Sequence, residues 1–294
     1  MAARIPFLTA VPLAALGLMV MGMTLIPLGD AAGKVLTEGL GATSGFVAWS
    51  RMTLGALLLV PVLGLAGLVQ LGGLLRDWRI WLRGVLMLGT IWAILTAVAT
   101  EDLATVYGAF FVGPFLSALL AVVFLGEKLG RAQAVCLGLG FVAVLLVVRP
   151  AGGITPGIGF ALLSGLCYGG YLTASRWLAG RAPPLVLLAS QFVLGAVLLA
   201  PAGLAAVPEV SGSLAGLMVV STLCSLGGNL FLILAYRRAP AVVLAPLVYV
   251  QLVAATGFGL VFFGHWPDWV VLAGLALLIA SGIAGYVFGA RRTG

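Results

Sequence analysis

The stretch VYGAFFVGPFLSALLAVVFLGEK, residues 106–128, contains a long apolar run that ends at a glycine, an acid and a base. A helix needs roughly 20 apolar residues to cross a bilayer, so the stretch predicts a membrane-spanning helix. Pro114 falls near its middle, where it leaves a carbonyl group without its usual donor. Such a break is tolerated where protein or a wet cavity satisfies the carbonyl. Pro114 therefore marks either a cavity or a kink made for packing.

The amino-acid composition puts the whole chain in the same class. Of 294 residues, 63% are hydrophobic and 8% are charged, whereas about a quarter of a soluble domain is charged. So few ionic groups do not cover the surface of a water-soluble protein. We expect an all-α integral membrane protein of the cell (inner) membrane, with many passes through the lipid bilayer.

Charged residues and Pro/Gly-rich stretches divide the chain into ten apolar segments joined by short loops. The expected helices are residues 8–29, 43–69, 80–99, 103–125, 131–149, 155–178, 184–206, 213–236, 241–263 and 268–289. With a cytoplasmic N-terminus, twelve of the fifteen Lys and Arg residues fall on the cytoplasmic side and two on the other. Cytoplasmic loops carry this excess, so both termini are predicted to be cytoplasmic. Basic residues scattered in this way predict no nucleic-acid partner.

The two halves of the chain show weak internal similarity. A shift of 138 residues aligns Gly126 with Gly264, Phe124 with Phe262, Val123 with Val261, Val112 with Val250 and Leu137 with Leu275. A repeat of five helices, an odd number, enters the membrane from opposite sides in its two copies. We therefore expect two inverted five-helix repeats, residues 1–150 and 151–294, as in many secondary transporters.

Two segments resemble the drug/metabolite transporter superfamily, EamA branch. They are YGAFFVGPFLSALLAVVFLGEKLGRAQAVCLGLGFVAVLLV (107–147), with its mid-helix proline and closing LGE plus a base, and WSRMTLGALLLV (49–60). The second half departs from this pattern, because His265 and Trp266 replace the acid and base and Leu252 replaces the proline. Pro246 lies six residues earlier and is a second candidate helix break. The resemblance implies ten helices, two halves and a transport function.

Polar and aromatic residues recur at helical spacing on several expected helices. In residues 155–178, Ser164, Tyr168, Tyr171 and Ser175 share one helix face. Lipid does not accept several such stripes, so we expect a shared central cavity. Its predicted lining is Met19, Met23, Trp92, Thr96, Tyr107, Phe111, Ser164, Tyr168, Tyr171, Ser225, Asn229, Tyr249 and Gln251. Alternatively, a hydroxyl can bond its own backbone and a terminal Tyr or Trp can lie at the membrane interface.

Arg51 is a charge within an expected membrane helix, which by default suggests a function. It lies near the outer end of that helix, where a long side chain can reach water. It can also pair with Asp30, Glu101 or Asp102, which are predicted at the same side. A gate or structural ion pair formed by these four residues is favoured over direct contact with a substrate.

The sequence offers little for catalysis. The one histidine, His265, is predicted in an outer loop, and no metal-ligand spacing or glycine-rich phosphate motif occurs. We therefore predict that the protein is not an enzyme, and that it uses no cofactor and no metal. Residues 165–169 and 285–289 have GxxxG spacing, which indicates close helix packing or, less favoured, dimerisation. The expected state is a monomer or a weak homodimer.

These observations predict a secondary transporter that exports a small-molecule substrate by alternating access around the cavity. Resemblance to the YddG-type exporters of aromatic amino acids puts aromatic or bulky neutral amino acids first. Drug or toxic-compound efflux and nucleotide-sugar or sugar-phosphate exchange are alternatives on the same fold, and a non-transporting membrane scaffold is an outside option. Since Asp30 is expected at the outer edge of the first helix and no acid at mid-membrane, obligatory proton coupling is not predicted.

Overall fold

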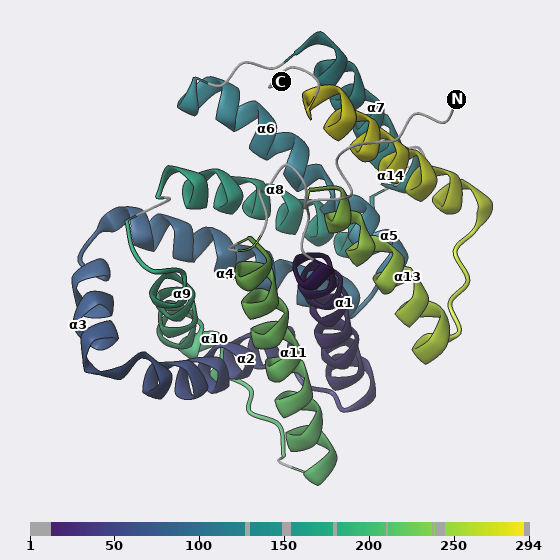
Figure 1. Cartoon of the computed structure of the whole chain (residues 1–294). Coiled ribbons are helices and arrows are strands. Elements are labelled where there is room, and N and C mark those ends of the chain that lie inside the picture. The colour runs from purple at the N-terminus through teal and green to yellow at the C-terminus, as the bar shows by residue number, and fades with distance from the viewer. Residues whose placement is uncertain are drawn as a thin grey trace.

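A computed structural model describes residues 13–126, 130–148, 154–178, 181–209, 211–236, 238 and 245–290. The described residues are helical or lie in short connections, with no strand among them, as expected (Figure 1). The N-terminal part holds α1 (Leu13–Lys34), η1 (Val35–Gly39), α2 (Ser44–Leu59), η2 (Val60–Leu63), α3 (Gly64–Leu74), α4 (Trp78–Val98), α5 (Leu103–Phe110), α6 (Val112–Leu125) and α7 (Arg131–Val148). The C-terminal part holds α8 (Pro156–Trp177), α9 (Pro184–Leu198), α10 (Ala200–Leu204), α11 (Gly212–Tyr236), η4 (Ala245–Tyr249), α13 (Val250–Phe263) and α14 (Trp269–Ala290).

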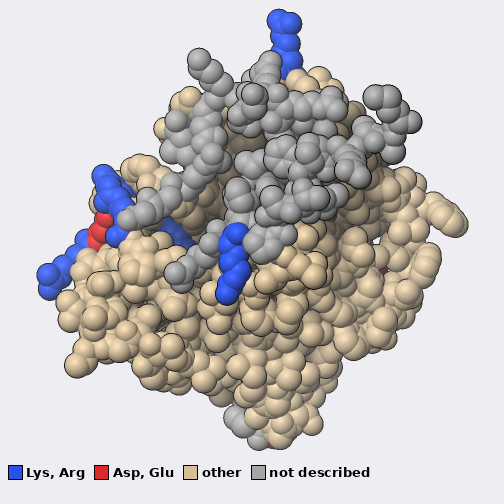
Figure 2. Space-filling view, in the orientation of Figure 1, with Lys and Arg blue, Asp and Glu red and all other residues tan. Residues whose placement is uncertain are grey.

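Six helical segments of the described chain are long and apolar enough to cross a membrane. They are Leu13–Gly39, Ser44–Leu74, Trp78–Val98, Leu103–Phe124, Pro156–Ser175 and Gly212–Ala235. Four shorter apolar helices accompany them: Ala134–Val148, Pro184–Leu198, Leu247–Phe263 and Trp269–Ala284. Large apolar side chains such as Leu65, Phe124 and Trp269 are exposed, and Figure 2 shows a wide described surface with neither acid nor base. An apolar exterior of this kind suits lipid rather than water.

The packing of the helices follows a paired scheme. Helix α1 packs against α11 and α13, while α8 packs against α4 and α6. Helices α7 and α14 lie side by side, as do α2 and α9 (Figure 1). Glycines make the crossing of α8 with α5 and α6 close, because a side chain at Gly165 or Gly169 would meet the backbone oxygen of Phe110 or Gly113. The GxxxG motif at 165–169 therefore packs inside the bundle; for 285–289 no side chain is described.

Several helices are broken where the sequence predicted one continuous segment. The expected helix 103–125 is interrupted at Phe111. Pro114 lies in the first turn of α6, where N–H groups have no partner within the helix, so the proline costs no hydrogen bond. Proline is also present early in η2 and α10, which divide the expected helices 43–69 and 184–206. Pro246 lies in η4, immediately before α13, so both predicted breaks fall at real helix junctions.

The first helix is longer than predicted. Instead of ending at residue 29, it continues through Asp30 to Lys34 and then as a π-helical turn to Gly39. The expected boundary at residue 29 rests on the charged and glycine-rich residues that follow it. In the structure both charged groups are buried and paired, so they do not end the helix. Asp30 therefore lies within the helical span, not at its edge.

Candidate functional site

A cavity of about 260 Å³ lies among the central helices. Helices α1, α4, α8 and α11 form most of its wall, α5 contributes two residues, and α2 and α13 contribute one each. The lining residues are Ile26, Asp30, Arg51, Arg83, Met87, Thr90, Ile91, Ile94, Tyr107, Phe110, Tyr168, Tyr171, Leu172, Ser175, Ser225, Asn229, Leu232, Ile233 and Gln251. An apolar wall with a few polar groups is typical of small-molecule sites.

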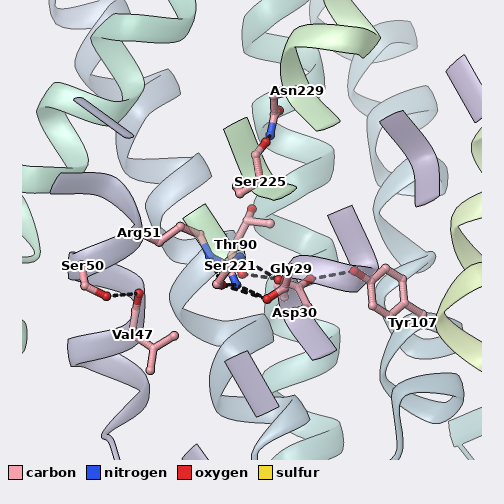
Figure 3. Close-up of polar contacts among 11 residues, drawn as sticks. Gly29, Asp30, Val47, Ser50, Arg51, Thr90, Tyr107, Ser221, Ser225 and Asn229 are labelled. Atoms are coloured by element: carbon pink, nitrogen blue, oxygen red, sulfur yellow. Dashed lines mark hydrogen bonds and ion pairs between the residues drawn. The ribbon is translucent and has the colours of Figure 1, made fainter. Parts of the chain in front are cut away.

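A buried ion pair occupies one part of this wall. Arg51 Nη1 on α2 and Asp30 Oδ1 on α1 lie 2.7 Å apart, and Tyr107 Oη on α5 donates to Asp30 Oδ2 at 2.7 Å (Figure 3). Arg51 Nη2 also donates to Ser221 Oγ at 2.8 Å and to the Gly29 carbonyl at 2.9 Å. Each carboxylate oxygen thus has a donor, and charge-assisted bonds of this length are the strong ones.

A second arginine lines the cavity, and no acid among the described residues pairs with it. Arg83, on α4, donates from Nε to Ser175 Oγ at 2.9 Å and from Nη2 to Tyr171 Oη at 2.9 Å. Nη1 donates to the Leu187 carbonyl at 3.1 Å, and Nη2 reaches Gln191 Oε1 at 3.4 Å. The guanidinium carbon also lies 4.8 Å from the centre of the Tyr171 ring, within cation–π range. This side chain is therefore fixed by neutral groups of α8 and α9.

Aromatic rings continue from this arginine along the wall. Tyr171 stacks with Tyr168, with ring centres 5.9 Å apart, and Tyr168 lies 4.9 Å from Phe110. Phe110 lies 5.9 Å from Tyr107, which bonds Asp30. The row of rings therefore connects the Arg83 cluster with the Asp30–Arg51 pair and offers flat apolar faces between two polar ends.

The structure brings six of the thirteen predicted lining residues to the cavity: Tyr107, Tyr168, Tyr171, Ser225, Asn229 and Gln251. Trp92 is 43% exposed on the outer face of α4, and Thr96 bonds the Trp92 carbonyl. They are correctly spaced on one helix face, but that face points away from the cavity. This is a correction to the predicted site.

The other five predicted lining residues lie in the packing between helices, four of them buried and Tyr249 partly buried. Met19 and Met23 pack with Ala15 and Ala235, and Phe111 stacks on Tyr249 with ring centres 5.3 Å apart. Ser164 Oγ donates to the Thr90 carbonyl at 2.8 Å. These residues hold helices together behind the cavity wall and do not line it.

The predicted gate residues form separate contacts. Arg51 pairs with Asp30, one of its three expected partners, and it is buried rather than reaching water. The Glu101 carboxylate accepts a hydrogen bond from Thr155, and its backbone oxygen accepts one from Lys34 Nζ at 2.9 Å. Asp102 pairs with His265 at 2.6 Å. Glu101 and Asp102 thus connect helix ends, away from Arg51.

Arg83 and the buried Lys34 are functional candidates that sequence reasoning missed, because both were counted only as charges that set the orientation of the chain. Lys34 Nζ bonds Glu38 at 2.7 Å and the Val98 carbonyl at 2.7 Å. For Arg83 a signal existed, since positions 83, 87, 90, 91 and 94 share one helical face of α4 and all line the cavity. Within the described ranges, no group of three His, Cys, Asp or Glu residues is placed to hold a metal.

Comparison with known proteins shows a family to which the second half of the chain is similar. Residues 155–287 match the EamA-like transporter family. The second half of the chain is thus similar to an EamA-like transporter domain. The matched residues 155–287 supply Tyr168, Tyr171, Asn229 and Gln251 to the cavity, whereas Asp30, Arg51, Arg83 and Tyr107 come from the other half of the chain.

Relatives extend the similarity beyond residues 155–287. A riboflavin transporter of Rhizobium johnstonii is 28% identical over 215 residues, which cover 70% of this chain and 69% of that protein. The pseudopaline exporter CntI of Pseudomonas aeruginosa is 27% identical over 198 residues, 64% of this chain and 67% of that one. A crystal structure with 20% identity shares the fold, with a TM-score of 0.65 over 95% of this chain and 99% of that chain. The chain is thus a multi-pass membrane protein whose relatives carry names of transporters rather than enzymes.

Proposed function

We propose that the protein is a secondary transporter of the inner membrane that exports a small organic solute by alternating access. The observation that carries this proposal is the cavity itself, which both halves of the chain line with polar and aromatic groups. A membrane scaffold has no need of buried arginines or a row of rings facing a cavity. Alternating access requires such a site between two parts that move against each other.

The proposed architecture is ten membrane spans in two inverted repeats, residues 1–150 and 151–294, with both termini cytoplasmic. Several features related by the 138-residue shift support it. Helices α6 and α13 both have 14 residues, and both end at a glycine with φ +68°, Gly126 and Gly264. The packing of α1 on α11 and α13 is repeated by that of α8 on α4 and α6. The excess of Lys and Arg in alternate loops supports the orientation.

We further propose that the solute is an amino acid with an aromatic or otherwise bulky apolar side chain. The row of Phe110, Tyr168 and Tyr171 supports an apolar body, and Asn229 and Gln251 supply neutral polar contacts. Ligand cavities commonly measure about 300–1,000 Å³, so a cavity of about 260 Å³ favours a solute of amino-acid size over a nucleotide sugar. The state of assembly proposed is a monomer or a weak homodimer.

Drug or toxic-compound efflux is the second candidate, and Asp30 is the observation that favours it. A buried acid in a membrane helix suits the recognition of a cation or a proton. Both Asp30 oxygens, however, already accept from Arg51 and Tyr107. A cation or proton would have to displace these groups, so we favour facilitated movement without obligatory proton coupling. The absence of obligatory proton coupling therefore rests on the hydrogen bonds of Asp30 to Arg51 and Tyr107. It does not rest on the position of Asp30, because this acid lies inside α1.

Uptake into liposomes tests the transport proposal. Purified full-length protein is reconstituted, and uptake of labelled phenylalanine, tryptophan and threonine is followed with and without a pH gradient. We expect uptake of phenylalanine and tryptophan in both conditions, and a loss of most of it in Tyr168→Ala. Trp92→Ala is the matched control, since it removes a ring outside the cavity. Absence of uptake in both conditions would overturn the amino-acid proposal.

A further inference from the structure

Among the residues that the structure describes, Arg83 has no acidic partner, unlike the other cavity arginine. Arg51 is neutralised by Asp30, whereas all the hydrogen bonds of Arg83 go to neutral oxygens. In the part of the chain that the structure describes, no carboxylate pairs with it. The residue is 6% exposed, so little water screens its charge. A buried charge without a counter-ion is costly, and this position therefore favours an anion.

The groups around Arg83 also have more donors than acceptors. The amide nitrogen Nε2 of Gln191, a residue 1% exposed, has no hydrogen-bond partner among the described atoms. Its oxygen already accepts from Arg83 Nη2 and from Tyr171 Oη. A guanidinium carries five N–H groups, and one N–H on Nη1 remains beyond the bond to the Leu187 carbonyl. Unused donors beside an unpaired cation are the chemistry of a carboxylate site.

The position of Arg83 relative to the rings defines how a ligand would lie. Its guanidinium contacts the Tyr171 ring, and the rings of Tyr168 and Phe110 follow along the wall. Beyond Phe110 lies Tyr107, bound to Asp30. With Asp30 and Arg51 cancelling each other, the charged groups of the lining sum to one positive charge, and Arg83 supplies it. An anionic group at Arg83 would leave the apolar body of the ligand against the rings.

We propose that Arg83 binds the carboxylate of the transported solute, while Phe110, Tyr168 and Tyr171 contact its apolar body. Tyr171, Ser175 and Gln191 position the guanidinium through their oxygens. This inference rests on the transport function proposed above and names the group that the cavity recognises. In the proposed topology α4 begins at the cytoplasmic side, so Arg83 is where an exported solute first meets a charge.

Three probes with the same phenyl body test the inference on the unmodified protein. Binding of L-phenylalanine, 3-phenylpropionate and phenethylamine to the purified full-length protein is measured by calorimetry. A charge-assisted hydrogen bond predicts that the two carboxylates bind roughly 10-fold to 100-fold more tightly than the amine. Tighter binding of 3-phenylpropionate than of L-phenylalanine would identify a simple carboxylic acid as the substrate class, and the reverse an amino acid. Equal binding of the amine would overturn the inference.

A charge-removing variant tests the residue itself. In Arg83→Gln we expect the two carboxylates to lose roughly 10-fold to 100-fold in affinity, while phenethylamine binds as before. Arg83→Lys keeps the charge but not the fork, and we expect it to recover part of the affinity. Arg181→Gln is the control, because this arginine is half exposed and pairs with Asp77 at 3.4 Å. If Arg83→Gln does not fold, the comparison of probes on the unmodified protein still decides.

The outcomes separate this inference from the transport proposal. If the unmodified protein binds and takes up phenylalanine and Arg83→Gln does so equally well, the proposed role of Arg83 is wrong and the transport proposal stands. Should none of the three probes bind or be taken up, the transport proposal fails for this class of solute, and the inference fails with it.

Discussion

Arg51 and Asp30 are 21 residues apart in sequence and belong to different helices, yet their side chains form a buried ion pair of 2.7 Å. Ser221 on α11 and Tyr107 on α5 bond the same pair, so it joins four helices (Figure 3). A single pair thus connects α1, α2 and α5 of the N-terminal half of the chain to α11 of the C-terminal half. Its loss therefore affects the bundle as a whole.

Asp30→Asn is expected to destabilise the protein strongly. The change leaves the Arg51 charge buried without a counter-ion, which costs about 3–5 kcal/mol in comparable buried pairs. Thermal unfolding of the detergent-purified protein measures the effect, and the double variant Asp30→Asn, Arg51→Met should unfold at a higher temperature than Asp30→Asn alone. Asp77→Asn is the control: it breaks a partly exposed pair with Arg181, worth about 0–1 kcal/mol. Equal effects of the two single variants would contradict the buried pair.

Tyr107→Phe is expected to weaken the same cluster by less. The ring remains, and one hydrogen bond to a charged group is lost, worth about 1.5–3 kcal/mol. Because Tyr107 and Asp30 act on one another, the losses in Tyr107→Phe and Asp30→Asn should not add in the double variant. Unfolding temperatures of the four proteins form the cycle. Strict additivity would show that the 2.7 Å bond from Tyr107 to Asp30 contributes nothing.

Features that depend on chain order and local chemistry were predictable from the sequence. The shift of 138 residues placed Gly126 on Gly264, and both adopt the left-handed conformation at the end of a 14-residue helix. The spacing of Tyr168 and Tyr171 identified a face of α8 that lines the cavity. Both features follow from local rules. A glycine in the left-handed conformation commonly ends a helix, and residues three or four positions apart lie on one helix face.

Features that depend on which neighbour a helix meets were not predictable. Trp92 and Thr96 share a face with helical spacing, but that face of α4 is the outer one. Arg83 was counted only toward the excess of cytoplasmic charge, although it falls within the expected helix 80–99. The direction of its side chain is set by packing on α8 and α9. The expected first helix ended before Asp30 because an unpaired charge within a membrane span is costly. Its partner, Arg51 on α2, is brought to it only by the packing of the helices.

Gly169→Ala is expected to destabilise the crossing of α8 with α6. An added Cβ would meet the Gly113 backbone oxygen, and a rigid backbone atom cannot move aside as a side chain does. Overpacking of this kind costs about 1–3 kcal/mol. Gly138→Ala in α7 is the matched control, because nothing lies within 4 Å of its added Cβ and alanine favours a helix by about 1 kcal/mol. Thermal unfolding should therefore fall for the first variant and stay level or rise for the second.

The side of the membrane on which each loop lies is tested by cysteine labelling. The three cysteines, Cys136, Cys167 and Cys224, are free and are first replaced by alanine. Trp266→Cys and Arg181→Cys are then introduced at exposed positions in two loops. A membrane-impermeant maleimide should label Trp266→Cys in intact cells and Arg181→Cys only after the membrane is opened.

The reason is the number of crossings between the two loops. In the proposed topology α9, α11 and α13 each cross once between positions 181 and 266, and an odd number places the loops on opposite sides. Labelling of both positions from the same side would require an even number of crossings and would remove the inverted repeat. The reverse pattern of labelling would keep the repeat but turn the protein over, which would contradict the placement of the Lys- and Arg-rich loops in the cytoplasm. Arg83 would then lie at the outer end of the cavity, and its proposed first contact would be with an imported solute.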